Sequence, residues 1–133
     1  MHGSHTNSGG RLASAPTEAD GDDSDPELAF EDVECGCRVA LVDTAGKLEN
    51  AVELLMVSGE PVAVDIEGAN LGARGQMATV QLCVEGSNDV FICDIVALGE
   101  KAFSTKRASL RVLLESADIM KLFWDCRTDA KAL

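Results

Sequence analysis

Residues 61–68, with the sequence PVAVDIEG, constrain the fold of this chain more than any other stretch. Valine or isoleucine occupies every second position from residue 62 to 66, and this is the period of a β-strand with one apolar face. Such a strand must bury that face under another layer of the protein. Asp65 and Glu67 then share the opposite face, roughly 7 Å apart along the backbone at a rise of about 3.3 Å per residue.

The same alternation has a simpler interpretation, because a half-buried strand with a solvated polar face shows it as well. Two carboxylates two positions apart repel each other, and a cation bound between them removes that repulsion. Ligand sets made only of oxygen atoms select hard ions such as Mg²⁺ or Mn²⁺. Asp65 and Glu67 alone therefore leave two possibilities open, a solvated strand face and a metal site.

Hydrophobic periodicity outside this strand predicts an ordered region that begins near Arg38. The expected elements are a strand at 39–42, a helix capped by Thr44 and ended by Gly59, strands at 62–67, 77–84 and 90–95, a helix at 106–115, a strand at 119–124 and a helix opened by Thr128. This β-α-βββ-α-β-α order combines a meander with helix–strand alternation. We therefore expect an α/β fold, a mixed β-sheet flanked by helices.

Residues 1–34 differ in composition from the rest of the chain. They hold nine Asp and Glu against one Arg, and so carry −8 of the net charge of −12. A segment this polar cannot bury enough apolar surface to offset the entropy lost on ordering. We expect a disordered acidic tail at 1–34, available to a protein partner, and a folded domain at 35–133.

The charge and composition exclude several classes of protein. A net charge of −12 argues against a simple basic nucleic-acid-binding module, because phosphate contacts are electrostatic. It is compatible with an enzyme whose metal ions bridge acidic side chains to phosphate. No apolar run reaches the roughly 18 residues of a membrane span, and the first residues lack the apolar core of a secretory signal. Five cysteines, several inside apolar runs, indicate reduced thiols and a cytoplasmic or nuclear location.

A second acidic cluster follows the strand expected at 119–124. Thr128 is expected to cap the next helix, which places Asp129 in the first turn, where the helix dipole favours a carboxylate by about 0.3–1 kcal/mol. Asp129 is then either an ordinary helix-start acid or a third metal-site carboxylate delivered beside the strand of Asp65 and Glu67.

These motifs in this order resemble the RNase D-like 3′–5′ exonuclease domains. The resemblance lies in VAVDIEGANLGARGQMATVQLCVEGSNDVFICDIVALG at 62–99 and LLESADIMKLFWDCRTDAKAL at 113–133, and is closest to the Egalitarian-type subgroup. Asp65 and Glu67 match the DxE of the first exonuclease motif, and Asp129 matches the Asp of the second. The resemblance covers about 39–133 and implies an RNase H-like mixed sheet flanked by helices.

The resemblance also implies a mechanism, in which two Mg²⁺ or Mn²⁺ ions promote hydrolysis of the terminal phosphodiester at the 3′ end of single-stranded RNA or DNA. Asp65 is expected to bridge both ions, and Glu67 to bind the ion that activates the attacking water. Asp129 is expected to support the second ion, largely through water. These three residues are therefore the expected catalytic and metal-binding set.

The sequence departs from the family at its third motif, which places a Tyr or His four residues before a final Asp. The chain contains no Tyr, and its only histidines are His2 and His5. We therefore expect the chain to hold the N-terminal part of such a domain and to be inactive or nearly so alone. The alternative is a non-catalytic relative that binds RNA or acts as a scaffold.

Four further residues carry minor expectations. Asn70 and Arg74 lie in the loop after the first motif, where they either contact nucleic acid or are ordinary loop residues. Asp94 is expected to face a turn or cap a helix rather than bind metal. Trp124 is expected to pack in the core rather than stack on a base.

Overall fold

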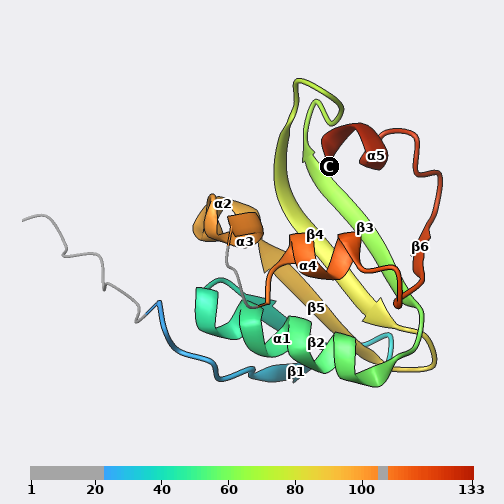
Figure 1. Cartoon of the computed structure of the whole chain (residues 1–133). Helices are drawn as coiled ribbons and strands as arrows, with labels where there is room; N and C mark the ends of the chain where they lie inside the picture. Colours follow the sequence, from blue (N-terminus) through green and yellow to red (C-terminus); the bar gives the residue numbers. More distant parts are fainter. Residues whose placement is uncertain (1–22, 105–107) are drawn as a thin grey trace, which may run out of the picture.

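The computed structural model describes residues 23–104 and 108–133, which form one mixed sheet with helices on one face (Figure 1). The six strands are β1 (Phe30–Asp32), β2 (Arg38–Val42), β3 (Val62–Ala69), β4 (Gln76–Val84), β5 (Asp89–Asp94) and β6 (Lys121–Phe123). The helices are α1 (Ala45–Ser58), α2 (Ile95–Leu98), α3 (Lys101–Ser104), α4 (Leu110–Glu115) and α5 (Asp129–Ala132). The expected α/β class with a mixed, helix-flanked sheet is confirmed.

The strands lie in the order β1-β2-β5-β4-β3-β6. β3, β4 and β5 form the expected antiparallel meander, whereas β2 runs parallel to β5 and β6 runs parallel to β3. Helices connect β2 to β3 and β5 to β6, and each crossover returns the chain in the same direction. β2, β3, β5 and β6 therefore all run parallel, and the neighbours β2/β5 and β3/β6 form parallel pairs. β3 is thus the last long strand before the short edge strand β6.

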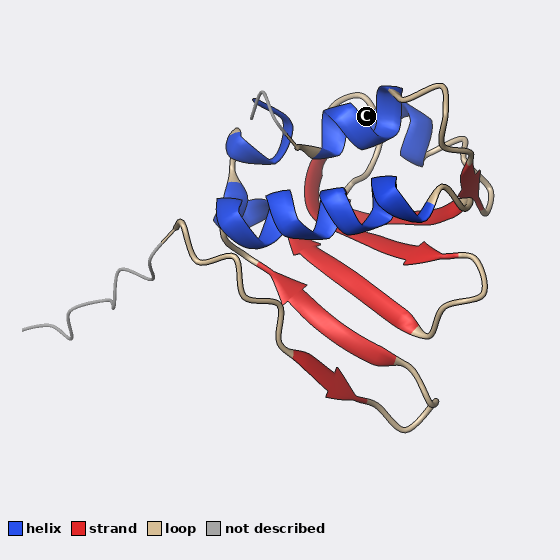
Figure 2. Cartoon of the chain, turned by 60° about the horizontal axis from the view of Figure 1, so that its bottom comes forward, coloured by secondary structure: helices blue, strands red, loops and turns tan. Residues whose placement is uncertain are grey.

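Helices cover one face of the sheet in the described residues (Figure 2). The apolar core lies between that face and the helices α1 and α4. The fully buried side chains of this core include Val42, Leu55, Leu82, Leu110 and Leu113. The opposite face carries half-exposed apolar side chains such as Leu41 at 51% and Leu122 at 41%. In the described residues, no helix is long and apolar enough to cross a membrane.

Helix α1 begins and ends where the sequence predicts. The Thr44 hydroxyl accepts a hydrogen bond from the Lys47 amide at 3.2 Å, and Gly59 closes the helix with φ +70°. The buried stripe is Leu48, Ala51, Val52 and Leu55. Expected helical spacing and observed burial therefore agree.

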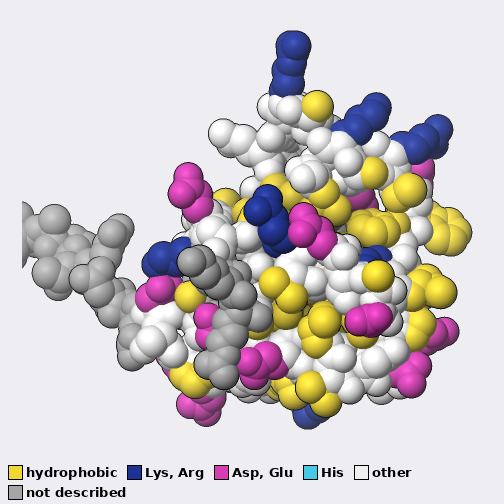
Figure 3. Space-filling view, in the orientation of Figure 1, with side chains coloured by type: hydrophobic (Ala, Val, Ile, Leu, Met, Phe, Trp, Pro, Cys, Tyr) yellow, Lys and Arg dark blue, Asp and Glu magenta, His cyan; other side chains and the backbone are white. Residues whose placement is uncertain are grey.

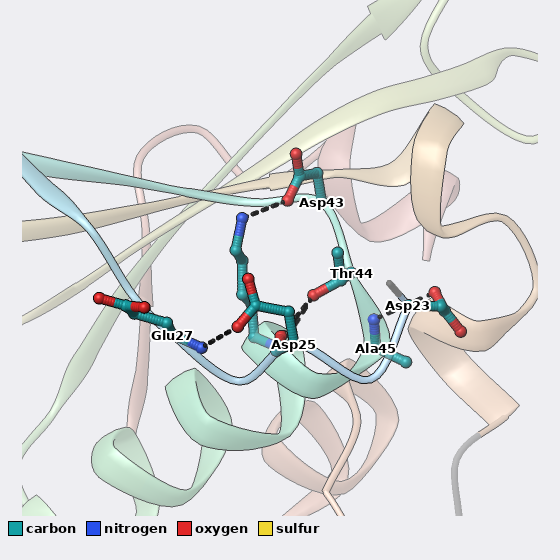
Figure 4. Close-up of polar contacts among 7 residues, drawn as sticks. Asp23, Asp25, Glu27, Asp43, Thr44 and Ala45 are labelled. Atoms are coloured by element: carbon teal, nitrogen blue, oxygen red, sulfur yellow. Dashed lines mark hydrogen bonds and ion pairs between the residues drawn. The ribbon is translucent and has the colours of Figure 1, made fainter. Parts of the chain in front are cut away.

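Residues 23–27 lie against the first turn of α1 (Figure 4). The Gly46 amide donates to the Asp23 carbonyl at 3.1 Å, and the Thr44 hydroxyl donates to the Asp25 carbonyl at 2.8 Å. A Cβ on Gly46 would lie 2.3 Å from the Ser24 carbonyl oxygen, so only glycine admits this contact. Order therefore begins earlier than residue 35, and β1 pairs with β2; residues 1–22 lie outside the described part.

The C-terminal elements differ in extent from their predictions. The helix expected at 106–115 begins only at Leu110, with residues 105–107 outside the described residues, and the strand expected at 119–124 is reduced to β6. α2 was not expected, although Asp94 caps it by accepting from the Ala97 amide at 3.0 Å, as its strand-end position predicts. Thr128 forms no capping hydrogen bond, because its backbone is already helical at φ −80°.

Candidate active site

β3 places Asp65 and Glu67 on the uncovered face of the sheet. Val64 and Ile66 alternate with them and are 3% and 2% exposed, whereas both carboxylates are exposed. The predicted alternation is confirmed. Neither carboxylate forms an ion pair or a side-chain hydrogen bond within the residues that the structure describes, so their negative charges are not compensated there.

A β-bulge follows Glu67 directly. Glu67 lies opposite Thr79, but Gly68 lies opposite Met77, so β4 inserts one extra residue at this point. A Cβ on Gly68 would lie 2.0 Å from the Gln76 carbonyl oxygen. The close approach of the two backbones requires glycine here, and the extra residue, Ala78, lies in β4 beside the strand end that carries Glu67.

The β3–β4 loop contains both residues expected to meet nucleic acid. Asn70 has a positive φ of 52°, and a Cβ on Gly75 would lie 2.1 Å from its carbonyl oxygen, so the loop is tightly closed. Asn70 and Arg74 are exposed, and neither side chain contacts Asp65 or Glu67 through a hydrogen bond or ion pair in the described part of the chain. Their role in binding stays a prediction.

Positive side chains gather at the end of the molecule where the β3–β4 loop and α5 lie, despite the acidic net charge (Figure 3). Arg74 comes from the loop, while Arg127 and Lys131 come from the segment that forms α5; all three are exposed. Arg127 is bound to Asp125 through two hydrogen bonds of 2.9 and 3.1 Å. The positive charge at this end suits contact with phosphate.

Asp129 begins α5 and is only 7% exposed. Burial raises the pKa of its carboxyl, and the negative charges of Asp65 and Asp125 raise it further. Asp129 therefore lies within electrostatic reach of Asp65. The structure thereby relates the two acidic clusters that are separated in the sequence.

The charge and donor type of these three carboxylates suit a divalent cation. Two of them are uncompensated, and the third has its ionised form disfavoured by a neighbouring carboxylate, which a cation would relieve. In the described residues, however, no three Asp, Glu, His or Cys side chains are gathered closely enough to hold one metal ion. Asp65 and Glu67 therefore have the charge and donor atoms for such an ion, whereas a shared site with Asp129 stays a prediction.

A hollow of about 460 Å³ lies next to Asp65 on the uncovered face. Its walls are mostly apolar and include Ala63, Gln81, Cys83, Leu122 and Trp124. Trp124 is 93% exposed, so the expectation that it packs in the core is wrong. β6 ends at Phe123, and the chain leaves the sheet before the tryptophan side chain can be covered.

Comparison with protein families shows to which family this chain belongs. Residues 39–133 match the model of the 3′–5′ exonuclease family. The chain belongs to this family. Its two acidic motifs and its fold make it an RNase D-like exonuclease domain, and the family generally uses divalent metal ions. The Egalitarian-type subgroup stays a prediction, and a search of curated proteins found no match.

Solved structures agree with this assignment. RNase D from Trypanosoma brucei, solved in complex with RNA U12, is 34% identical, with a TM-score of 0.60 over 71% of this chain and 32% of that one. The catalytic core of RRP6 from Trypanosoma brucei, at 21% identity, shares the fold with a TM-score of 0.62 over 84% of this chain and 29% of that one. The chain thus spans about a third of the length of these structures.

Proposed function

We propose that this exonuclease domain hydrolyses the terminal phosphodiester at the 3′ end of single-stranded RNA or DNA. The observation that carries the proposal is the exposure of Asp65 and Glu67 on one sheet face, with Asp65 within electrostatic reach of the buried Asp129. The relative from Trypanosoma brucei was solved with RNA, which favours RNA as the substrate class.

Each acidic residue has a separate role in this proposal. Asp65 would be a ligand shared by the bound ions, and Glu67 would hold the ion that activates the attacking water. Asp129, at the start of α5, would support the second ion, largely through water. Bound Mg²⁺ or Mn²⁺ ions supply charge neutralisation at the phosphate and lower the pKa of the attacking water. Arg74 and Lys131 at the positive end attract the phosphate backbone toward these carboxylates.

We expect the 133-residue chain by itself to be inactive or nearly so. The third family motif contributes a Tyr or His that orients the water, and this chain contains no Tyr and only His2 and His5. A site that acts as a unit loses most of its rate when one member is missing. The assay is shortening of a 5′-labelled single-stranded oligonucleotide with Mn²⁺. Metal-dependent 3′ shortening that disappears in Asp65→Ala would contradict this expectation.

Metal binding is tested separately, by thermal unfolding with and without Mn²⁺. An ion at about one hundred times its dissociation constant stabilises by about 2.7 kcal/mol, which is on the order of 10–20 °C for a domain of this size. We expect Glu67→Gln to remove most of that shift. Glu53→Gln, the same change at an exposed position of α1, is the matched control and should retain it.

The same titration separates the exonuclease from a non-catalytic relative that binds RNA or acts as a scaffold. A binding module has no use for uncompensated neighbouring carboxylates, and its stability should not respond to Mn²⁺ through Glu67. An equal shift in the wild type, Glu67→Gln and Glu53→Gln would therefore remove the support for metal-dependent hydrolysis.

The five free cysteines accord with a reducing location such as the cytoplasm or nucleus.

A further inference from the structure

Trp124 and Asp65 border the same hollow on the uncovered face of the sheet. β3 and β6 are parallel, with Ala63 opposite Leu122 and Val64 opposite Phe123. Trp124 follows directly after the last paired residue of β6. Asp65 and Trp124 both line the 460 Å³ hollow, so an aromatic ring and the proposed metal-binding carboxylate border the same space.

The exposure of Trp124 is unusual for so large an apolar side chain. It is 93% exposed, more than any other large hydrophobic residue in the described part of the chain. Asp125 adopts a positive φ of 50° directly after it and is held by the two hydrogen bonds from Arg127. The chain therefore turns away from the sheet at this point, and the indole ring stays outside the core.

The chemistry around Trp124 suits a nucleobase. Every base has a π face that stacks on an aromatic ring, and proteins that bind single strands combine such rings with positive side chains. The side chain of Arg127, three positions after Trp124 in the sequence, is 84% exposed. The hollow has the size of a small-molecule site, about 300–1,000 Å³, and its walls are mostly apolar with one carboxylate.

We propose that Trp124 is the stacking platform for a base of the single strand whose phosphate lies at Asp65. The inference rests on the exonuclease function proposed above and adds to it a residue that holds the nucleotide. Trp124 is a positioning residue in this proposal, since it contacts the base and leaves the phosphate to the carboxylates and the ions.

The single tryptophan of the chain makes the proposal directly measurable. The full chain is titrated with a 5′-labelled RNA hexamer whose last linkage is a phosphorothioate, which resists hydrolysis. Anisotropy of the label reports binding, and indole emission reports contact with Trp124. An abasic hexamer with the same phosphates is the matched ligand control. We expect the RNA hexamer to quench the emission and the abasic hexamer to leave it unchanged.

Substitutions give a second readout. We expect Trp124→Ala to weaken binding of the RNA hexamer about tenfold, as loss of one stacked base does, and Trp124→Phe to retain most of the affinity. Because the side chain is exposed, Trp124→Ala should leave the urea midpoint unchanged, so weaker binding is not a folding defect.

Three results would overturn the proposal in distinguishable ways. If the hexamer binds but the emission is unchanged and Trp124→Ala binds equally well, Trp124 holds no base and the exonuclease function still stands. If the hexamer does not bind, both proposals fail. If the emission changes with protein concentration and not with the hexamer, Trp124 belongs to a contact between copies of the chain.

Discussion

Substitution of Gly68 by Ala tests how the bulge beside Glu67 is built. The added Cβ would lie 2.0 Å from the Gln76 carbonyl oxygen, 2.9 Å from the Met77 Cα and 3.0 Å from the Ala78 amide nitrogen. All three atoms belong to the backbone of β4, so rotation of a side chain cannot relieve the contact. β4 must move away from β3 by about 1 Å or more at this point, because Cβ contacts under 3.0 Å essentially never occur.

The expected cost has two parts. Overpacking of this kind costs about 1–3 kcal/mol, and the displacement weakens about two ladder hydrogen bonds worth about 0.5–1.5 kcal/mol each. The sum is roughly 2–6 kcal/mol, a large share of the 5–15 kcal/mol that stabilises a typical domain. At a urea dependence of about 1–3 kcal/mol per molar, the unfolding midpoint should fall by roughly 1–3 M.

The matched control is Gly86→Ala in the β4–β5 turn. Gly86 has a positive φ of 78° and nothing within 4 Å of its added Cβ, so the change costs only the conformational preference of about 1 kcal/mol. Urea unfolding followed by circular dichroism measures both variants. Equal midpoints for Gly68→Ala and Gly86→Ala would refute the reasoning, since they would show that β3 and β4 separate at the bulge without cost.

Three further outcomes follow from the described contacts. Asp129→Asn should stabilise the metal-free protein at neutral pH, because the raised pKa of Asp129 means that its ionisation destabilises the folded state. The difference in urea midpoint between this variant and the wild type should shrink as the pH is lowered to about 4, where the Asp129 carboxyl of the wild type becomes protonated. Thr44→Ala should cost about 1 kcal/mol or more in the same assay, since it removes the cap of Lys47 and the bond to the Asp25 carbonyl. Val57→Ala, at an 86% exposed position of the same helix, should change the midpoint by less than about 0.5 kcal/mol.

The sequence predicts the elements whose signals are local. α1 has a capping threonine, a helical stripe and a terminal glycine within 16 residues, and β3 has strict alternation, so both appear close to their expected positions. β1 carries no such signal. Its Phe30 is held by contacts far along the chain, an edge-to-face ring contact with Phe91 at 5.5 Å and the Arg38 guanidinium 5.0 Å from its ring. Tertiary contacts of this kind decide where order begins, and composition does not reveal them.

In the candidate site, too, some features follow from local sequence signals and others from tertiary contacts. The shared face of Asp65 and Glu67 follows from a period of two, which is readable in the sequence. The burial of Asp129 depends on how α5 packs against the rest of the domain. Thr128 was expected to cap this helix and so to place Asp129, but its side chain forms no capping hydrogen bond. Trp124 was misplaced because an aromatic residue after an apolar run resembles the continuation of a strand, whereas β6 ends one residue earlier.

The shortness of β6 has a consequence for amide hydrogen exchange. β3 pairs with β4 over its whole length, but with β6 only through Val62, Ala63 and Val64. The segment from β6 to α5 can therefore open at a lower free energy than the rest of the sheet and carry Asp129 away while Asp65 and Glu67 stay in place. An ion held jointly by the three carboxylates would oppose that opening. Slower exchange in 121–133 on adding Mn²⁺, with β4 unchanged, would thus report how completely the third carboxylate is engaged.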